Sequence, residues 1–323
     1  SSAVEIALKM SFHTWRNQGQ AAKNRFLCLA DSYHGETLGT LSVGDVALYK
    51  DAYAPLLRQA DTVPSPDARQ AQPGESAVAV ARRAAIALEN HLAEHHQSIA
   101  ALIVEPLVQG AGGMIMYDPE YLRLARMLCD RYQVHLICDE IMVGFGRTGT
   151  LFAHEQAGIR PDFLCLSKGL TGGYLPLSVV LTTDPIYATF YDDAVVRGFL
   201  HSHSYTGNPL ACRAALATLD IFAKDAVLER NRRFARRFTT LLEPLAKHPQ
   251  ARHFRQTGMI WAVDIETDDP EFRLRFYREA LNRDVLLRPL GTTIYFMPPY
   301  ILDDDETALL AERAVAALKA ALV

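Results

Sequence analysis

Apolar residues recur along the chain in two patterns, which predict strands and helices in alternation. Short apolar runs bounded by charged or turn residues predict buried strands at residues 25–30, 101–104, 135–138, 163–166 and 177–182. Longer stretches with apolar positions three or four apart predict helices, the first on the stripe Val4, Leu8, Phe12 and Trp15, and others over residues 77–96, 119–131, 209–222 and 226–247. The alternation predicts an α/β fold with a mostly parallel sheet flanked by helices.

The last third of the chain has a different pattern. Strands are predicted at residues 259–265, 285–287 and 293–297, a helix at 270–282, and a final Ala/Leu-rich helix after the acids at 303–306. We therefore predict a large domain at residues 1–222 and a small α+β domain at 223–323. Residues 49–76 contain four prolines and are expected to be irregular.

Composition narrows the class of protein. The chain has 323 residues, 49% hydrophobic and 22% charged, which excludes a disordered chain, and no apolar run approaches a membrane-spanning length. The net charge of −4 gives no support for nucleic-acid binding. The five cysteines are odd in number and have no C-x-x-C spacing, which is typical of reduced cysteines in a cytoplasmic protein.

Two charged residues directly follow predicted buried strands. Asp139 ends the run at 135–138, and Lys168 comes just after the run at 163–166. Ligands in α/β proteins bind at the carboxyl ends of strands. A lysine that forms a Schiff base and an aspartate that pairs with a pyridinium nitrogen are what pyridoxal 5'-phosphate (PLP) requires. The alternative is that Asp139 caps a helix and Lys168 is a solvated loop residue.

The same region contains a competing motif. Gly144, Gly146 and Gly149 match G-x-G-x-x-G, the fingerprint of dinucleotide-binding oxidoreductases. Five residues separate the strand from the first glycine, so we interpret the glycines as a tight turn. His201 and His203 form an H-x-H pair without further ligands nearby, and no metal site is expected.

Other polar residues are candidates for ligand binding. Ser1 and Ser2 precede a helix, where they suit capping or a phosphate. The loop that contains Tyr33 and Glu36 follows a predicted strand. It is expected either to face a ligand or to form an ordinary turn. Ser204 begins a run of hydroxyl residues that suits an anion. Arg288 is suited to clamp a carboxylate, although a surface arginine is the more common case.

These stretches together carry a family resemblance. The chain resembles the class III, fold-type I PLP-dependent aminotransferases over nearly its whole length. Within this class it is most similar to the adenosylmethionine-8-amino-7-oxononanoate aminotransferases of biotin biosynthesis. The matching stretches are SSAVEIALKM, SYHGETLGTLSVG, IVEPLVQGAGGM, ICDEIMVGFGRTG, CLSKGLTGG, HSYTGNPLAC and RPLGTTIYFMPPYIL.

The resemblance implies a role for each matching residue. Lys168 matches the Schiff-base lysine and Asp139 the partner of the pyridinium nitrogen. The implied roles of the others are phosphate binding by Ser1 and Ser2, ring stacking by Tyr33, phosphate binding from a neighbouring subunit by Ser204, carboxylate binding by Arg288, and substrate contacts by Glu36, Arg147 and Tyr295.

The resemblance also implies a homodimer with composite active sites and a transamination of 8-amino-7-oxononanoate. Two departures bear on this expectation. The family's N-terminal segment is expected to be missing from this chain. The HSHSYTGN stretch is closer to relatives that use lysine than to users of S-adenosylmethionine, so both amino donors stay open. Three alternatives stay open. The first is another PLP enzyme of the same fold, such as a class III ω-amino-acid transaminase or an aminomutase. The others are an inert fragment that keeps the fold and a dinucleotide-dependent oxidoreductase.

Overall fold

The computed structural model describes residues 1–322 and divides the chain into two units. The first comprises Ser1–Phe145 and Phe152–Ile221, and the second comprises Gly146–Leu151 and the chain from Phe222 onward. The turn Gly146–Leu151 thus packs with the second unit, whereas the predicted boundaries placed it in the first. The reason is a backbone hydrogen bond of 2.8 Å from Met259 N–H to the Arg147 carbonyl. The division into domains 1–222 and 223–323 stays a prediction.

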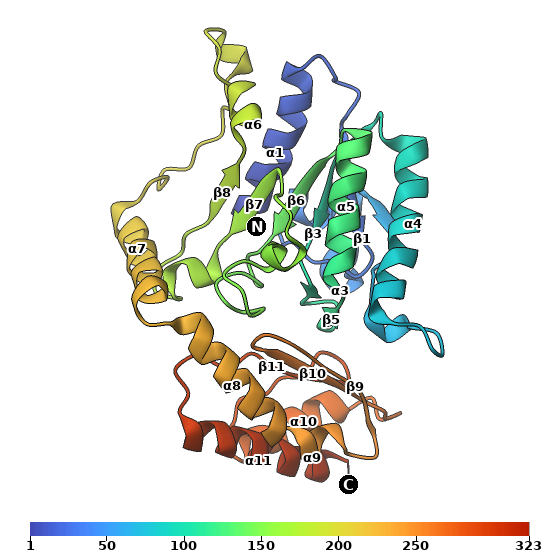
Figure 1. Ribbon diagram of the computed structural model, residues 1–323, viewed down its shortest axis with the longest axis vertical. Coiled ribbons are helices and arrows are strands. Elements are labelled where there is room, and N and C mark those ends of the chain that lie inside the picture. The colour runs from blue at the N-terminus through green and yellow to red at the C-terminus, as the bar shows by residue number, and fades with distance from the viewer. Residues whose placement is uncertain (323) are drawn as a thin grey trace. The chain divides into compact units, whose positions relative to one another are not determined.

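A six-stranded sheet forms the centre of the first unit, in the order β2-β1-β3-β6-β7-β8 (Figure 1). All neighbouring pairs are parallel except β7 and β8. The prediction of a mostly parallel sheet is confirmed. The strands are β1 (Arg25–Leu29), β2 (Asp61–Val63), β3 (Ile99–Val104), β6 (His135–Asp139), β7 (Phe163–Leu166) and β8 (Val179–Thr182), with a separate pair β4 (Val108–Gln109) and β5 (Ile115–Met116).

Helices cover both faces of this sheet, as predicted (Figure 1). The apolar stripe of α1 packs in one core cluster with Ile103, Ile137 and Phe163 of three strands. On the other face α4 and α5 lie side by side. The Asp118 side chain caps α5 by accepting from Glu120 N–H. The helices of the unit are α1 (Ser2–Asn17), α2 (Leu38–Ser42), α3 (Ala47–Lys50), α4 (Ala77–His95), α5 (Pro119–Tyr132), α6 (Asp184–Ala188) and α7 (Pro209–Lys224), which runs across the boundary between the units.

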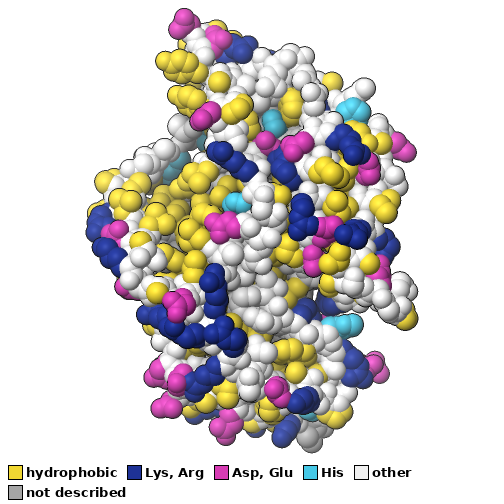
Figure 2. All heavy atoms as spheres, in the orientation of Figure 1, with side chains coloured by type: hydrophobic (Ala, Val, Ile, Leu, Met, Phe, Trp, Pro, Cys, Tyr) yellow, Lys and Arg dark blue, Asp and Glu magenta, His cyan; other side chains and the backbone are white. Residues whose placement is uncertain are grey.

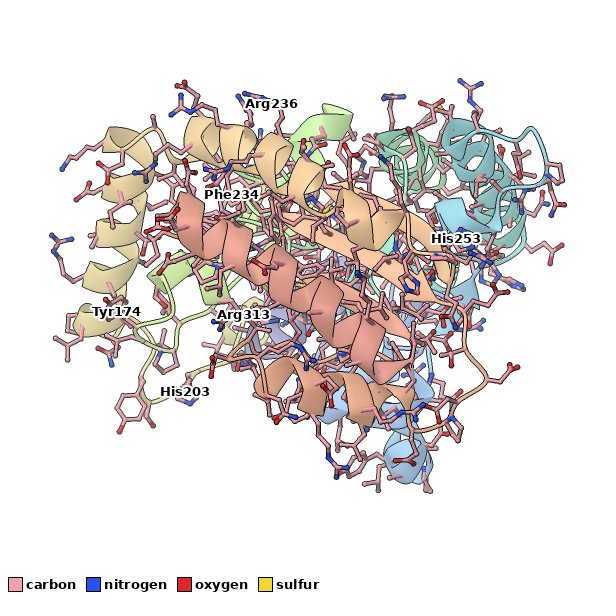
Figure 3. All side chains as sticks on the ribbon, turned by 90° about the horizontal axis from the view of Figure 1, so that it is seen from below. Tyr174, His203, Phe234, Arg236, His253 and Arg313 are labelled. Carbon is pink, nitrogen blue, oxygen red and sulfur yellow. The ribbon has the colours of Figure 1, made fainter. Side chains whose placement is uncertain are left out.

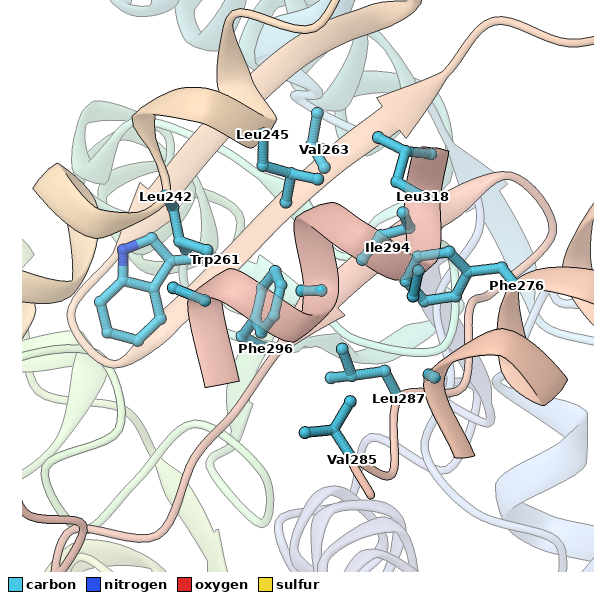
Figure 4. Close-up of a cluster of buried hydrophobic side chains, with 14 of the residues drawn as sticks. Leu242, Leu245, Trp261, Val263, Phe276, Val285, Leu287, Ile294, Phe296 and Leu318 are labelled. Carbon is cyan, nitrogen blue, oxygen red and sulfur yellow. The ribbon is translucent and has the colours of Figure 1, made fainter. Parts of the chain in front are cut away.

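The second unit is a three-stranded antiparallel sheet, β11-β10-β9, with helices on it. Its core gathers Trp261, Phe276 and Phe296 from strands and helices (Figure 4). On α8, Phe234 points toward α11 and Arg236 points away (Figure 3), which is the amphipathic pattern of a core-facing helix. The elements are α8 (Val227–Leu241), α9 (Glu243–Ala246), β9 (Ala251–Thr257), β10 (Ile260–Ile265), α10 (Phe272–Leu281), β11 (Thr293–Phe296) and α11 (Asp304–Ala321).

The structure corrects three expectations about the elements. The predicted strand at 285–287 is wrong, because this segment pairs with no strand. The strand β9 was not predicted. The proline-rich stretch expected to be irregular contains β2, which pairs in parallel with β1. Within residues 1–322, no helix is both long and apolar enough to cross a membrane.

Candidate active site

Four neighbouring parallel strands of the first unit end at the same edge of the sheet, and each is followed by polar side chains. Such an edge is where α/β proteins bind ligands. Asp139 and Lys168, both predicted from the sequence, lie there. The residues concerned are Tyr33 and His34 after β1, Glu105 after β3, Asp139 at the end of β6 and Lys168 after β7.

The Asp139 carboxylate is buried, with its side chain 6% exposed. Its Oδ2 lies 2.8 Å from His34 Nδ1, and its Oδ1 accepts a hydrogen bond of 3.1 Å from Ile141 N–H. A carboxylate oxygen has more than one lone pair, so the group retains capacity to accept from a cationic N–H of a ligand. The carboxylate is thus held by one contact to a distant segment and one within the turn that follows it.

Lys168 begins a short 3-10 helix, Lys168–Thr171, immediately after β7. Its φ of +44° is rare for a residue with a side chain and marks a strained backbone. In the sheet Asp139 is the register partner of Cys165, three positions before Lys168. The side chain is exposed, which leaves the amine accessible to a carbonyl compound.

The start of α1 and the loop after β1 form one group of side chains. Ser1 Oγ accepts a hydrogen bond of 3.0 Å from Glu36 N–H, and Tyr33 Oη donates to Glu36 Oε1 at 2.8 Å. Gly35, at φ +124°, packs so closely on Ser1 that a Cβ would overlap it. Ser2, at the first position of α1, is exposed, as is Ser1. The structure therefore brings together Ser1, Ser2, Tyr33 and Glu36.

Glu105 is a site residue that the sequence predictions missed. It is buried, and its carboxylate accepts hydrogen bonds of 2.9 Å from the N–H groups of Tyr33 and Gly110. Burial raises the pKa of Glu105 to about 7, against the opposing effects of His34 and these two N–H donors. A signal was available, because Glu105 follows a wholly apolar strand just as Lys168 does.

Ser204 lies in an exposed turn, residues 204–207, just before α7. The residues around Ser204 form hydrogen bonds with one another. Tyr205 N–H donates to His203 Nδ1 at 3.1 Å, and His203 N–H donates to Thr206 Oγ1 at 3.2 Å. The side chains of this loop face solvent, and Ser204 lies outside the buried group around Asp139.

Arg288 and Tyr295 belong to the second unit, where both line a pocket of about 770 Å³. Arg288 is exposed, and Tyr295 is half-buried on β11. Tyr277 of α10 and Leu310 of α11 contribute to the remaining wall. The pocket thus combines an arginine with apolar and aromatic surface, which suits a carboxylate on an aliphatic chain.

Arg147 also belongs to the second unit. Its guanidinium donates to the Pro298 carbonyl at 2.8 Å and lies 4.5 Å from the ring centre of Tyr300. Burial lowers its pKa, and the Tyr300 hydroxyl opposes this effect. The predicted roles of Arg147 and Glu36 in substrate binding stay predictions.

Comparison with known proteins identifies the family. A family model described as aminotransferase class-III matches residues 1–318. The chain belongs to the class III aminotransferases. It is therefore a PLP-dependent aminotransferase, and the G-x-G-x-x-G motif is not that of a dinucleotide-dependent oxidoreductase.

Named relatives and solved structures agree with this assignment. An adenosylmethionine-8-amino-7-oxononanoate aminotransferase from Helicobacter pylori is 47% identical over 98% of this chain and 72% of its own length. One of that name from Nitratidesulfovibrio vulgaris is 41% identical over 96% of this chain and 59% of its own. A crystal structure of such an enzyme from Methanocaldococcus jannaschii is 31% identical, with a TM-score of 0.89, covering 98% of this chain and 73% of that one. The ω-transaminase from Pseudomonas jessenii in complex with PMP is 28% identical, with a TM-score of 0.93, covering 99% and 73%.

The residues of the first unit fit the groups that PLP carries. The buried Asp139 carboxylate, already held by two donors, suits the ring nitrogen, and the exposed Lys168 amine suits the aldehyde. The start of α1, with the Ser1 and Ser2 hydroxyls, suits the phosphate, because free N–H groups and the helix dipole favour an anion there.

Proposed function

We propose that the chain transfers an amino group to 8-amino-7-oxononanoate, which gives 7,8-diaminononanoate in biotin biosynthesis. The observation that carries this proposal is the 47% identity, over 98% of the chain, to a relative that bears this enzyme's name. The pocket of the second unit, where Arg288 stands beside apolar side chains, suits the remote carboxylate and alkyl chain of this substrate.

The proposed catalytic residues are Lys168 and Asp139. When bound, PLP supplies an electron-accepting ring that stabilises negative charge at the carbon bearing the amino group. Lys168 would bind the cofactor through its side-chain amine and would move the proton at the substrate carbon as a general base and acid. Asp139 would hold the proton on the ring nitrogen, on which the electron-accepting character of the ring depends.

Further residues of the first unit are proposed to bind the cofactor. Ser1 and Ser2 bind the phosphate at the start of α1, and Tyr33 stacks on the ring. The Tyr33 backbone N–H is fixed by Glu105, which orients the residue. Ser204 is proposed to reach the phosphate of a neighbouring subunit, which agrees with its exposed position before α7.

Four residues are proposed to bind the substrate: Arg288, Tyr295, Glu36 and Arg147. Arg288 binds the oxononanoate carboxylate with its two-pronged guanidinium, and Tyr295 contributes to the same pocket. Glu36 and Arg147 are proposed to contact the substrate on the side of the reacting group.

We further propose a homodimer. More than half of the large hydrophobic side chains that are exposed within residues 1–322 fall between residues 174 and 221. Figure 2 shows hydrophobic side chains gathered beside α7, and Figure 3 shows Tyr174 and His203 on the same outer edge of the first unit. A contiguous apolar surface of this kind typically marks a protein interface. Sedimentation of the PLP-bound protein as a dimer is expected, and a monomer that binds PLP fully would contradict the proposal.

The proposed amino donor is S-adenosylmethionine or lysine, and the proposed location is the cytoplasm. The five cysteines support the location, because the structure records each as a free thiol and four of them are buried.

A second candidate function is transamination of another ω-amino acid or amine. Solved ω-transaminases share the fold at a TM-score of 0.93, although their sequence identity of 28% is lower than that of the named relatives. Both candidates share the cofactor and differ in the substrate.

The test is an assay of the purified full chain with PLP. Incubation with 8-amino-7-oxononanoate and either S-adenosylmethionine or lysine should yield 7,8-diaminononanoate, detected by mass spectrometry. The visible absorbance of the bound cofactor should disappear on borohydride reduction and in Lys168→Ala. Turnover of ω-amino acids without turnover of the oxononanoate would favour the second candidate. Absence of both the absorbance and the turnover would indicate an inert fragment.

A further inference from the structure

A buried polar cluster lies behind the candidate cofactor site, and its histidine has no role so far. His34 Nδ1 lies 2.8 Å from Asp139 Oδ2, with the two side chains 0% and 6% exposed. Glu105, also buried, holds the backbone N–H of the preceding residue, Tyr33, at 2.9 Å. These contacts thus link three segments distant in the sequence, those of His34, Glu105 and Asp139.

The surroundings of His34 indicate which nitrogen carries the proton. The Asp139 carboxylate accepts from Ile141 N–H through its other oxygen, and an ionised carboxylate can only accept, so Nδ1 is the donor. His34 Nε2 is buried and has no hydrogen-bond partner within residues 1–322. His34 therefore donates to Asp139 from Nδ1 and orients the carboxylate for a further partner.

We propose that His34 is a positioning residue, which fixes the Asp139 carboxylate for the cofactor's ring nitrogen while Glu105 fixes the segment that carries His34. This inference rests on the proposed role of Asp139. A bent hydrogen bond or a rotated carboxylate weakens a charge-assisted contact steeply. A carboxylate whose orientation is fixed by His34 therefore binds the ring N–H better than a carboxylate that can rotate.

The test compares two substitutions at His34 with the same two at His135. His34→Asn keeps an N–H donor near the place of Nδ1, whereas His34→Phe keeps the ring and removes the donor. His135 is the matched control: it is also buried, it lies at the opposite end of β6, and its Nδ1 is 2.9 Å from Ser11 Oγ. The readouts are the dissociation constant of PLP from the full-length apoprotein by equilibrium dialysis, kcat and KM separately, and the Tm of the apoprotein.

In His34→Phe we expect PLP binding to weaken by roughly 10- to 100-fold and kcat to fall, because a hydrogen bond to a charged group is lost. His34→Asn should restore most of both. His135→Phe should lower the apoprotein Tm and leave PLP binding within about twofold of the parent, because it lies away from the site. If His34→Phe does not fold, His34→Gln takes its place, since its amide extends past the position of Nδ1.

Two results would overturn the inference: PLP binding and kcat in His34→Phe equal to those of the parent, or His34→Asn as impaired as His34→Phe. Equal losses in His34→Phe and His135→Phe would likewise mean that the histidine serves packing alone. Failure of the proposed function looks different, because the parent protein would then not turn over 8-amino-7-oxononanoate, whatever its affinity for PLP.

Discussion

The backbone of Gly258 packs directly on the backbone of Thr148, so closely that a Cβ at position 258 would overlap the Thr148 carbonyl carbon. The adjacent Met259 N–H donates to the Arg147 carbonyl at 2.8 Å. The turn Gly146–Leu151 is therefore part of the second unit through contacts that only glycine permits at position 258.

Gly258→Ala should destabilise the protein by roughly 2–4 kcal/mol, because a positive φ and a steric overlap add their costs. Gly291→Ala is the matched control. The two glycines have nearly the same φ, +56° and +57°, but nothing lies within 4 Å of a Cβ at position 291. We expect the control to cost about 1 kcal/mol, from the backbone conformation alone. Urea unfolding of the two variants measures the difference, and equal losses would contradict the close packing.

The main elements were predictable because apolar periodicity reports burial, and the missed ones show the limit of that signal. Edge strand β9 is half-exposed and carries basic residues, so it lacks an apolar face. In the segment 285–287, Val285 and Leu287 are buried and Leu286 is exposed, which is a strand-like alternation. The alternation predicts which side chains face the core, but it cannot tell whether the backbone finds a neighbouring strand.

The site was predictable in part. Asp139 and Lys168 follow apolar runs, so their position at strand ends could be inferred without a structure. The contact of His34 with Asp139 could not, because it joins residues 105 positions apart and depends on the order of strands in the sheet. Strand order follows from packing of the whole unit rather than from any local pattern.

His135 should make stability depend on pH in the acid range. Burial lowers its pKa to about 4, below the 6.5 expected in the unfolded chain. Between these values the unfolded chain binds a proton that the folded chain does not, so stability falls as pH drops from 6.5 to 4, by up to about 3 kcal/mol. His135→Asn should show a flatter profile over this range in urea unfolding. Parallel profiles of variant and parent would mean that His135 does not titrate differently on folding.

At saturating PLP, Asp139→Asn should keep the bound cofactor, with its visible absorbance, and lose turnover by roughly 100-fold or more, since a neutral amide does not stabilise the proton on the ring nitrogen. Asp162→Asn is the control, because Asp162 pairs with Arg126 at 2.7 Å and accepts from Leu136 N–H, at the start of β6. The control should lose stability and keep kcat. Turnover of Asp139→Asn close to that of the parent would remove Asp139 from its proposed role.

Arg288 provides the most specific test of the proposed substrate. 8-Amino-7-oxononanoate has a carboxylate remote from its reacting carbonyl, and Arg288 lines the pocket of the second unit together with Tyr295. A guanidinium binds a carboxylate through two parallel hydrogen bonds, which the single ammonium of lysine cannot reproduce. Loss of such a charge partner typically costs roughly 2–5 kcal/mol, or more than tenfold in affinity.

Arg288→Ala should therefore raise KM for the oxononanoate more than tenfold and leave the absorbance of the bound cofactor unchanged, and Arg288→Lys should recover only part of the loss. Arg236→Ala is the control, because Arg236 is an exposed arginine on α8 of the same unit (Figure 3). If the α-carboxylate of the amino donor uses the same guanidinium, the donor half-reaction weakens in Arg288→Ala as well, which single-turnover kinetics with each substrate would separate. Kinetics equal to those of the parent in Arg288→Ala would make Arg288 an ordinary surface arginine. The assignment of this substrate would then depend on the similarity to the named relatives alone.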